Sequence, residues 1–516
     1  MSWLLALDVG TQSARALVFD TRGELIARVQ ERFDPVYHAE QPGWAEQDAD
    51  LYWQAIARAC RQLWQQGIDP QRLRGVALTT QRGTVVAVDE QGQPLRPAIT
   101  WLDQREVAKV AVMPQPWRSL LATLGVSDAV ERFRRQAECV WMAQNESELW
   151  ARTHKFLLLS GYLNYRLCGE YVDAVSAQVG YLPFDFKRQA WERPWSWKWS
   201  ALPVRPQMLP RLFEPAHCMG MISARAAAET GLPQGLALIA AGADKACEVL
   251  GSGCLEPHMG AISYGTTATI NTTQGRYYEV RPLLPAYPAA VPQAYLTEVQ
   301  TFRGFWMVQW FKEQFGHPEL QRAEDEGLIV ESLFDDLLRE TPAGAMGLML
   351  QPYWTPGVRE PGREAKGAMI GFGDVHERAH VYRAIIEGLA YSLREGRAHI
   401  EKRTGRRIKV LRVSGGGSQS DEVMRITADI MGLVAERPHT YETSGLGAAM
   451  NIAVGLGLHA NHAQAVAAMC RVGERFVPDP QRQQLYHQLY ERVWSRMYER
   501  LRPLYHELRS ITGYPD

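Results

Sequence analysis

The chain lacks the features of several protein classes. Its seven cysteines include no Cys-x-x-Cys pair, and the odd number argues against a disulfide framework. The 56 basic and 57 acidic residues leave a net charge of −1, so no excess charge points to nucleic acid or to a membrane surface. No apolar run is long enough to span a bilayer, and no basic segment with a cleavage site opens the chain. We therefore expect a cytoplasmic protein with no nucleic-acid and no membrane partner.

The length and the order of secondary structure predict two α/β domains. At 516 residues the chain is too long for a single core. Strand-like segments at 75–81 and 84–89 alternate with helical periodicity at 51–60 and 381–390, and residues after 460 are expected to be helical. The glycine-rich segment 251–257 is the best candidate hinge. We expect an N-terminal domain over residues 1–250 and a C-terminal domain over residues 255–516.

The first strand ends in a turn with phosphate-binding groups. Two apolar strands within residues 3–20 surround the sequence Asp-Val-Gly-Thr-Gln-Ser at 8–13, which is typical of a β-hairpin. Glycine lets the backbone approach a phosphate, and hydroxyls and backbone N–H groups bond its oxygens. Mg²⁺ prefers carboxylates with phosphates and water, so Asp8 is the candidate metal partner. An ordinary surface hairpin is the alternative. The candidate phosphate-binding residues are Thr11, Gln12, Ser13 and Arg15, although Arg15 is also suited to support the hairpin.

A second hairpin of the same design is predicted in the other half of the chain. Residues 259–270 are β-prone and surround a turn of Gly265, Thr266 and Thr267. This second turn lacks the aspartate, so we expect it to contact phosphate without metal. Two such hairpins, one in each half, indicate two related domains that share one nucleotide.

Seven motifs in order resemble those of the FGGY family of carbohydrate kinases, a branch of the actin/hexokinase/Hsp70 ATPase superfamily. The resemblance covers about residues 3–457. The motifs are Asp8–Arg15, Gly43–Asp48, Trp101–Arg105, Gly242–Asp244, Gly265–Thr267, Gly415–Ser420 and Leu446–Ala449. Each motif alone is short, but seven in the family order make chance agreement very improbable. The resemblance implies an α/β fold of two actin-like ATPase (ribonuclease H-like) domains with a central cleft.

The resemblance assigns chemistry to Asp244 and to a glycine cluster. Asp244 follows an apolar strand and is expected to be the catalytic base, since phosphoryl transfer needs a group that accepts the hydroxyl proton. The alternative is that Asp244 caps a helix, and one residue can do both. The glycine cluster after the strand 410–414 is otherwise an ordinary β–α turn. In the family this cluster lines the nucleoside, which assigns nucleotide binding to Gly415, Gly416, Gly417 and Ser420.

The residues expected to bind the phosphate acceptor differ from those of glycerol kinases and from those of xylulose kinases. At 80–83 the chain has Thr-Gln-Arg-Gly, which shares the arginine with glycerol kinases and the glycine with xylulose kinases. Arg82 and Lys245 together suit a carboxylate, so an aldonate is a candidate acceptor; a solvated surface charge is the alternative. Trp101 suits a sugar face, with Asp103 and Arg105 bonded to hydroxyls or to each other. The predicted substrate-binding residues are Gln81, Arg82, Trp101, Asp103, Asp244 and Lys245.

The resemblance predicts an ATP- and Mg²⁺-dependent kinase that phosphorylates a hydroxyl of a sugar or polyol. A ketose such as a pentulose is the first expectation, with glycerol or an aldonate as others. A homodimer is compatible with the family. The alternative is a non-catalytic nucleotide-gated sugar sensor or an actin/Hsp70-like ATPase, because one fold hosts many functions.

Overall fold

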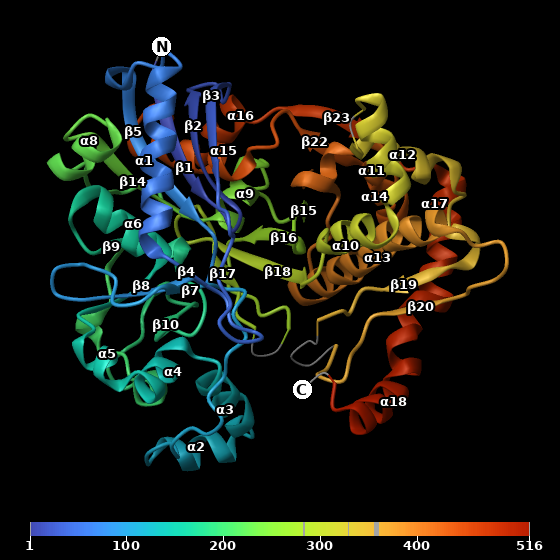
Figure 1. The fold of residues 1–516 in the computed structure, drawn as a ribbon, viewed down its shortest axis with the longest axis horizontal. Helices are drawn as coiled ribbons and strands as arrows, with labels where there is room; N and C mark the ends of the chain where they lie inside the picture. The colour runs from blue at the N-terminus through green and yellow to red at the C-terminus, as the bar shows by residue number, and fades with distance from the viewer. Residues whose placement is uncertain (1, 282–283, 329, 356–360, 515–516) are drawn as a thin grey trace. The chain divides into compact units, whose positions relative to one another are not determined.

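The computed structural model describes residues 2–281, 284–328, 330–355 and 361–514, which form two compact units. The first unit comprises Met1–Gly253, Gly275–Leu296 and Glu442–Cys470, and the second comprises Cys254–Gln274, Thr297–Tyr441 and Arg471–Asp516. Each unit is therefore assembled from separate stretches of sequence (Figure 1). No helix within the described ranges is both long and apolar enough to cross a membrane.

A six-stranded sheet forms the centre of the first unit. Its strand order is β13-β14-β5-β1-β2-β3. β1 pairs antiparallel with β2 and parallel with β5, and β5 pairs parallel with β14. The three parallel strands therefore end at one edge. The strands are β1 (Trp3–Val9), β2 (Ser13–Asp20), β3 (Leu25–Arg32), β5 (Leu73–Thr80), β13 (Cys218–Met221) and β14 (Ala237–Ala243).

Alternation along β1 assigns its side chains to the two faces of this sheet. Leu5, Leu7 and Val9 belong to one core with residues of α1 (Ala49–Gln65) and α6 (Leu159–Cys168). Asp8 therefore points to the opposite face. On that face α15 (Thr443–Gly455) contacts β1, β5 and β14.

Helix α15 packs tightly against α9 (Asp244–Gly251) because both carry glycine at the contact. A Cβ on Gly447 would lie 2.0 Å from the Cys247 carbonyl oxygen, and one on Gly251 would lie 1.9 Å from the Thr443 carbonyl oxygen. The close approach fixes the start of α9 against α15, and Asp244 is the first residue of α9.

A smaller sheet and several short helices complete the first unit. The order of this sheet is β4-β7-β6-β8, and its side chains form a second core with α4. The remaining elements are β4 (Glu46–Gln47), β6 (Val85–Val88), β7 (Ala98–Ile99), β8 (Lys155–Leu158), β9 (Val172–Ala174), β10 (Phe184–Asp185), β11 (Ala190–Trp191), β12 (Arg211–Phe213), β17 (Tyr287–Pro288), α2 (Trp117–Thr123), α3 (Ser127–Arg135), α4 (Glu138–Asn145), α5 (Ser147–Arg152), α7 (Trp197–Ala201), α8 (Ala224–Thr230) and α16 (His462–Met469).

The second unit repeats the strand order of the first. Its sheet runs β22-β21-β15-β16-β18, with β23 beside β22, and β15, β21 and β22 are parallel. The first unit has β14-β5-β1-β2-β3 in the same order. The strands of this sheet that belong to the second unit are β15 (Met259–Tyr264), β16 (Ala268–Gln274), β18 (Tyr295–Thr301), β21 (Val410–Ser414), β22 (Ala435–Pro438) and β23 (Val472–Phe476). The internal repeat expected from the two hairpins is thus present at the level of topology.

The helices of the second unit all follow β18 in the chain. They are α10 (Trp306–Phe315), α11 (His317–Glu326), α12 (Val330–Glu340), α13 (Arg378–Thr404), α14 (Asp421–Met431), α17 (Pro480–Leu489) and α18 (Ser495–Thr512). The strands β19 (Met349–Gln351) and β20 (Ala368–Ile370) pair antiparallel in a two-stranded sheet. The expectation of helices throughout the region after residue 460 is wrong for β23. That segment pairs antiparallel with β22, a partner 34 or more residues away in the chain, so local periodicity does not reveal it.

Candidate functional site

Two carboxylates flank β5 at the edge where the parallel strands of the first unit end. The register sets Asp8 of β1 opposite Thr79 of β5, and it sets Gly242 of β14 opposite the same Thr79. Asp244 follows two residues later. Neighbouring strands lie about 4.8 Å apart, so the backbones that carry the two aspartates are separated by roughly 10 Å. Ligands of α/β sheets bind at this kind of edge.

Asp8 is buried in a network of charged groups. Its Oδ2 accepts a hydrogen bond from Nη1 of Arg15, its cross-strand neighbour, at 3.1 Å. Glu442, which directly precedes α15, lies 3.7 Å from Arg15 and 2.9 Å from Arg28. Burial raises the pKa of Asp8 to about 6, and the nearby charge of Arg15 opposes that shift. A positive ligand would offset the cost of this buried negative charge.

Asp244 begins α9 without capping it. The capping position belongs to Ala243, and no side chain accepts a bond there. The Asp244 Oδ1 instead accepts from the backbone N–H of Lys245 at 2.7 Å. Burial raises the pKa of Asp244 to about 6, against the lowering effects of Lys245 and Arg82. A carboxylate with this pKa is ionised at neutral pH and still basic enough to accept a proton.

The β1–β2 turn carries the predicted phosphate-binding residues, which differ in exposure. Gln12 is exposed and Thr11 is half-buried, whereas Ser13 is buried. The Ser13 hydroxyl accepts from Gln30 Nε2 at 3.0 Å. The Thr11 hydroxyl accepts from the indole Nε1 of Trp101 at 2.9 Å. The turn therefore presents Thr11 and Gln12 outward and uses Ser13 within the sheet.

The loop after β5, residues 81–83, carries two of the predicted acceptor-binding residues and is called the acceptor loop below. It is hydrogen-bonded to the same edge of the sheet. The Gln81 N–H donates to the Val9 carbonyl at 2.8 Å, and Gln81 Nε2 donates to the Tyr52 hydroxyl at 3.3 Å. Among the described residues, the buried Oε1 of Gln81 has no hydrogen-bond partner. The Arg82 guanidinium lies 5.1 Å from the ring centroid of Tyr287. The loop thus has one unsatisfied acceptor atom and a cation close to Asp244.

Lys245 forms an ion pair with Glu248 inside α9. Its Nζ lies 2.7 Å from Glu248 Oε2, and both side chains are largely removed from water. Nearby Glu248 and Asp244 raise the pKa of Lys245 although burial opposes them. The predicted substrate-binding cation is therefore already partnered by a carboxylate of its own helix.

The sequence trio Trp101, Asp103 and Arg105 divides into two groups in the structure. Arg105 is buried between the rings of Trp44 and Trp141, at 3.9 and 4.6 Å from their centroids. It donates to Asp103 at 2.8 and 2.7 Å, so these two residues bond to each other as the packing alternative expects. Trp101 points instead to the phosphate hairpin. A substrate role for Asp103 stays a prediction.

The second unit holds the remaining predicted nucleotide residues in two turns. In the β15–β16 turn, Thr266 is exposed while Thr267 is buried and donates to the Phe302 carbonyl at 3.2 Å. The Gly265 carbonyl accepts from the Phe305 N–H at 3.0 Å.

The glycine cluster after β21 requires glycine for steric reasons. Gly415 has a φ of 82°, and a Cβ there would lie 2.7 Å from the Tyr264 carbonyl oxygen. A Cβ on Gly417 would lie 2.2 Å from the Phe305 ring. Gly416 is exposed and a Cβ would meet nothing there. The loop therefore packs its backbone directly on β15 and exposes one glycine.

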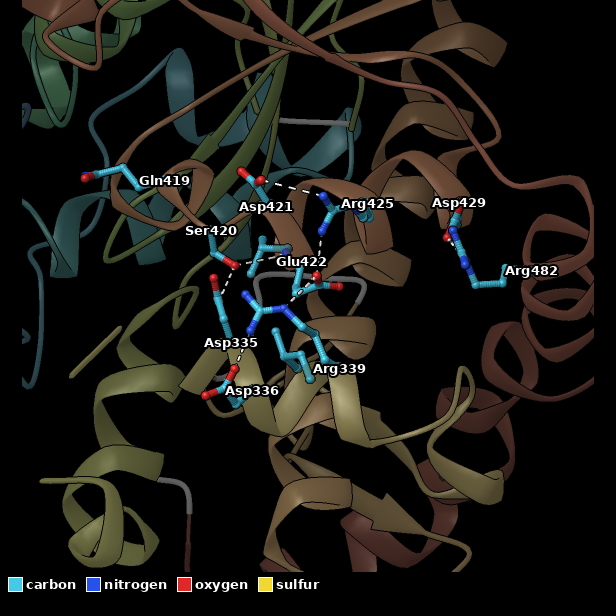
Figure 2. A network of polar contacts seen from close by, with 12 residues as sticks. Asp335, Asp336, Arg339, Gln419, Ser420, Asp421, Glu422, Arg425, Asp429 and Arg482 are labelled. Carbon is cyan, nitrogen blue, oxygen red and sulfur yellow. Dashed lines mark hydrogen bonds and ion pairs between the residues drawn. The ribbon is translucent and has the colours of Figure 1, made fainter. Parts of the chain in front are cut away.

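Two charged side chains that the sequence did not indicate hold this loop. Arg437 of β22 donates to the carbonyls of Ser418 at 2.6 Å and Gln419 at 3.4 Å. Asp335 of α12 accepts from the Ser420 hydroxyl at 2.5 Å, and that hydroxyl also caps α14 at Val423 (Figure 2). Neither residue lies near the loop in sequence, so no local signal could have identified them.

The donor set at Asp8 is suited to a metal that is held mainly by phosphates. Among the described residues, no group of three or more His, Cys, Asp or Glu side chains could hold a metal alone. Asp8 is a buried carboxylate beside a turn that carries the half-buried Thr11 and the exposed Gln12. Mg²⁺ prefers one or two carboxylates with substrate phosphates and water, and the residues present fit that arrangement.

Comparisons with known proteins agree with the topology. Residues 3–251 match the N-terminal domain and residues 260–456 the C-terminal domain of the FGGY family of carbohydrate kinases. A xylulose kinase of Lactococcus lactis is 28% identical over 98% of this chain and 99% of its own length. A glycerol kinase of Dechloromonas aromatica is 28% identical over 92% of this chain and 93% of its own. The crystal structure of xylulose kinase from Rhodospirillum rubrum has a TM-score of 0.79 at 24% identity, covering 98% of this chain and 100% of that chain, which shows a shared fold.

Proposed function

The chain belongs to the FGGY family of carbohydrate kinases, phosphotransferases with an alcohol group as acceptor, and we propose that it transfers the γ-phosphate of ATP to a hydroxyl of a small sugar or polyol. The observation that carries this proposal is the pair of aspartates at one sheet edge, Asp8 on β1 and Asp244 after β14. Phosphoryl transfer needs one carboxylate on the metal side and another at the attacking hydroxyl.

Each residue at this edge has a separate role in the proposed reaction. Asp244 accepts the proton of the acceptor hydroxyl as the oxygen attacks, because its carboxylate is basic and lies at the strand end. Thr11, Gln12 and backbone groups of the β1–β2 turn bind phosphate oxygens. Arg15 holds Asp8 in place through the bond at 3.1 Å. Asp8 would hold Mg²⁺, directly or through water, and the bound ion would neutralise charge on the phosphates.

The second unit supplies the other proposed nucleotide contacts. Thr266 and Gly416 are exposed in their turns, so their polar groups are free to meet a ligand. Thr267, Gly415, Gly417 and Ser420 are used in packing or capping, and we propose that they shape the turns that the nucleotide contacts.

A neutral ketose, with a pentulose first, is the acceptor class that we propose. The xylulose and glycerol kinases that are 28% identical support a neutral polyhydroxylated acceptor. The Lys245–Glu248 pair supports the same class, because it neutralises the cation that otherwise favours an aldonate. Gln81, Arg82 and Trp101 are the proposed acceptor contacts. A cytoplasmic location and a homodimer stay predictions.

The test is ADP release from the purified protein with Mg·ATP against a panel of ketoses, polyols, deoxysugars and aldonates. We expect turnover with a neutral member of the panel, and we expect Asp244→Asn to abolish it while nucleotide still binds. Asp89→Asn, in a turn of the first unit, is the matched control for the chemical change and should behave as wild type. Acceptor-dependent turnover near wild type in Asp244→Asn would refute the base assignment. Nucleotide binding with no response to any acceptor would favour the sensor.

A further inference from the structure

One hydrogen bond joins the predicted acceptor side to the predicted phosphate side. The indole Nε1 of Trp101 donates to the hydroxyl oxygen of Thr11 at 2.9 Å, across 90 residues of sequence. Trp101 follows β7 of the small sheet, while Thr11 lies in the turn of the central sheet. Both side chains are half-buried. The bond therefore links the small sheet and the central sheet of the first unit.

The chemistry of the two groups gives this bond a direction. An indole N–H is only a donor, so the threonine oxygen must accept. The threonine hydroxyl keeps its own hydrogen, which has to be donated elsewhere. Among the described residues, no side chain or carbonyl accepts a hydrogen bond from the Thr11 hydroxyl, which itself accepts one from Trp101. A phosphate oxygen is an acceptor that bears negative charge, which suits that remaining hydrogen.

Trp101 also lies next to Gly83 of the acceptor loop. A Cβ on Gly83 would lie 3.5 Å from the Cβ of Trp101, and the φ of 74° at Gly83 requires glycine there. Gly83 directly follows Gln81 and Arg82, and Gln81 is bonded to Val9 at the end of β1. Trp101 therefore lies beside the loop after β5, while its indole bonds to the turn after β1.

From this geometry we infer that Trp101 is a positioning residue for the nucleotide: its indole N–H fixes the Thr11 oxygen as an acceptor and so directs the Thr11 hydrogen to a phosphate oxygen. The inference rests on the proposed function, because it needs a phosphate at the β1–β2 turn. The inference gives Trp101 a role in nucleotide binding in addition to the acceptor contact that we propose for its ring. Binding of the nucleotide then affects the affinity for the acceptor, and binding of the acceptor affects the affinity for the nucleotide, through the Trp101 side chain.

A double-mutant cycle on nucleotide affinity tests the inference without knowledge of the acceptor. The probe is a non-hydrolysable ATP analogue with Mg²⁺, measured by calorimetry on wild type, Trp101→Phe, Thr11→Val and the double variant. We expect Thr11→Val to weaken binding about tenfold, the usual scale for a hydrogen bond to a charged group. We expect Trp101→Phe to weaken it several-fold, and the double variant to bind no worse than Thr11→Val alone.

Controls separate positioning from a general structural effect. Thr11→Ser keeps the hydroxyl and should bind within about twofold of wild type. Adenosine carries no phosphate, so its affinity should not change in Trp101→Phe, whereas a distorted fold would weaken both ligands. If Trp101→Phe proves unstable, Trp101→Tyr takes its place in the double-mutant cycle, because tyrosine keeps a large ring without the indole N–H.

The outcomes are distinct. Multiplicative losses in the double variant, or an unchanged affinity for the analogue in Trp101→Phe, would overturn the inference while the proposed kinase stands. Wild-type protein that binds no nucleotide would instead overturn the proposed function, and the inference with it.

Discussion

Lys245, which directly follows Asp244, forms an ion pair of 2.7 Å with Glu248, one helical turn further along α9. Lys245 lowers the pKa of Asp244 and Glu248 raises it, so the two charges oppose each other at the proposed base. Arg82 likewise lowers the pKa of Asp244, and Asp8 likewise raises it. The Lys245–Glu248 pair therefore adds no net charge beside Asp244.

This relationship predicts opposite pH shifts from the two partners. Lys245→Gln should move the acid limb of the pH–rate profile to higher pH, and Glu248→Gln should move it to lower pH. The variant with both changes should lie close to wild type, because both effects are removed together. Lys312→Gln breaks a similar Lys–Glu pair in the second unit and serves as the control. Shifts in the same direction for both single variants would contradict the arrangement.

Activity should fall in acid as Asp244 is protonated. Burial places the pKa of Asp244 near 6, and only the ionised carboxylate can accept the hydroxyl proton. We expect kcat/KM to be flat above about pH 7 and to fall about tenfold per pH unit well below 6. Steady-state rates with saturating Mg·ATP measure this limb. A profile that stays flat down to pH 5 would exclude Asp244 as the titrating base.

Asp244→Asn should stabilise the protein at neutral pH although it removes activity. The raised pKa means that the folded state binds a proton more tightly than the unfolded state, so ionisation above pH 6 costs folding free energy. An amide carries no such cost, and we expect a gain on the order of 1–3 kcal/mol at pH 7.5 that disappears at pH 4 and below. Denaturant unfolding at the two pH values measures it. An equal change in the free energy of unfolding at the two pH values would assign the effect to packing.

Removal of the Asp8 carboxylate should weaken the response to magnesium. Asp8→Asn is expected to raise the Mg²⁺ concentration for half-maximal activity about tenfold or more, because one oxygen ligand or its water bridge loses its charge. Titration of activity with MgCl₂ at fixed ATP measures this, with Asp89→Asn as the control. A magnesium dependence equal to that of wild type would remove Asp8 from the metal side.

Arg437→Gln should weaken ATP use without a change on the acceptor side. Arg437 holds two carbonyls of the glycine loop and also bonds Asp421 at 2.7 Å. Loss of these bonds lets the loop shift, so we expect the KM for ATP to rise about five- to tenfold while the KM for the acceptor stays the same. Arg425→Gln, on the exposed side of the neighbouring helix, is the matched control (Figure 2). Equal effects on both substrates would point to general destabilisation.

The sequence alone determined the parts of this protein that depend on neighbouring residues. The two hairpins, the strands predicted at 75–81 and 410–414 and the helical segments predicted at 51–60 and 381–390 follow from periodicity and turn composition, which are local, and the structure has strands and helices at these places. The sequence also predicts that Asp8 and Asp244 lie at strand ends, because Asp8 is near the end of one apolar run and Asp244 directly follows another.

The tertiary structure decided the rest, because it depends on contacts between distant segments. β23 is a strand through its pairing with β22, and Arg105 is held between the rings of Trp44 and Trp141. Glu442 beside Asp8 and Arg437 on the glycine loop come from elements that only the fold brings near. A residue type and its local pattern indicate which chemistry is available, whereas partners from other strands and helices decide the charge and direction of each group.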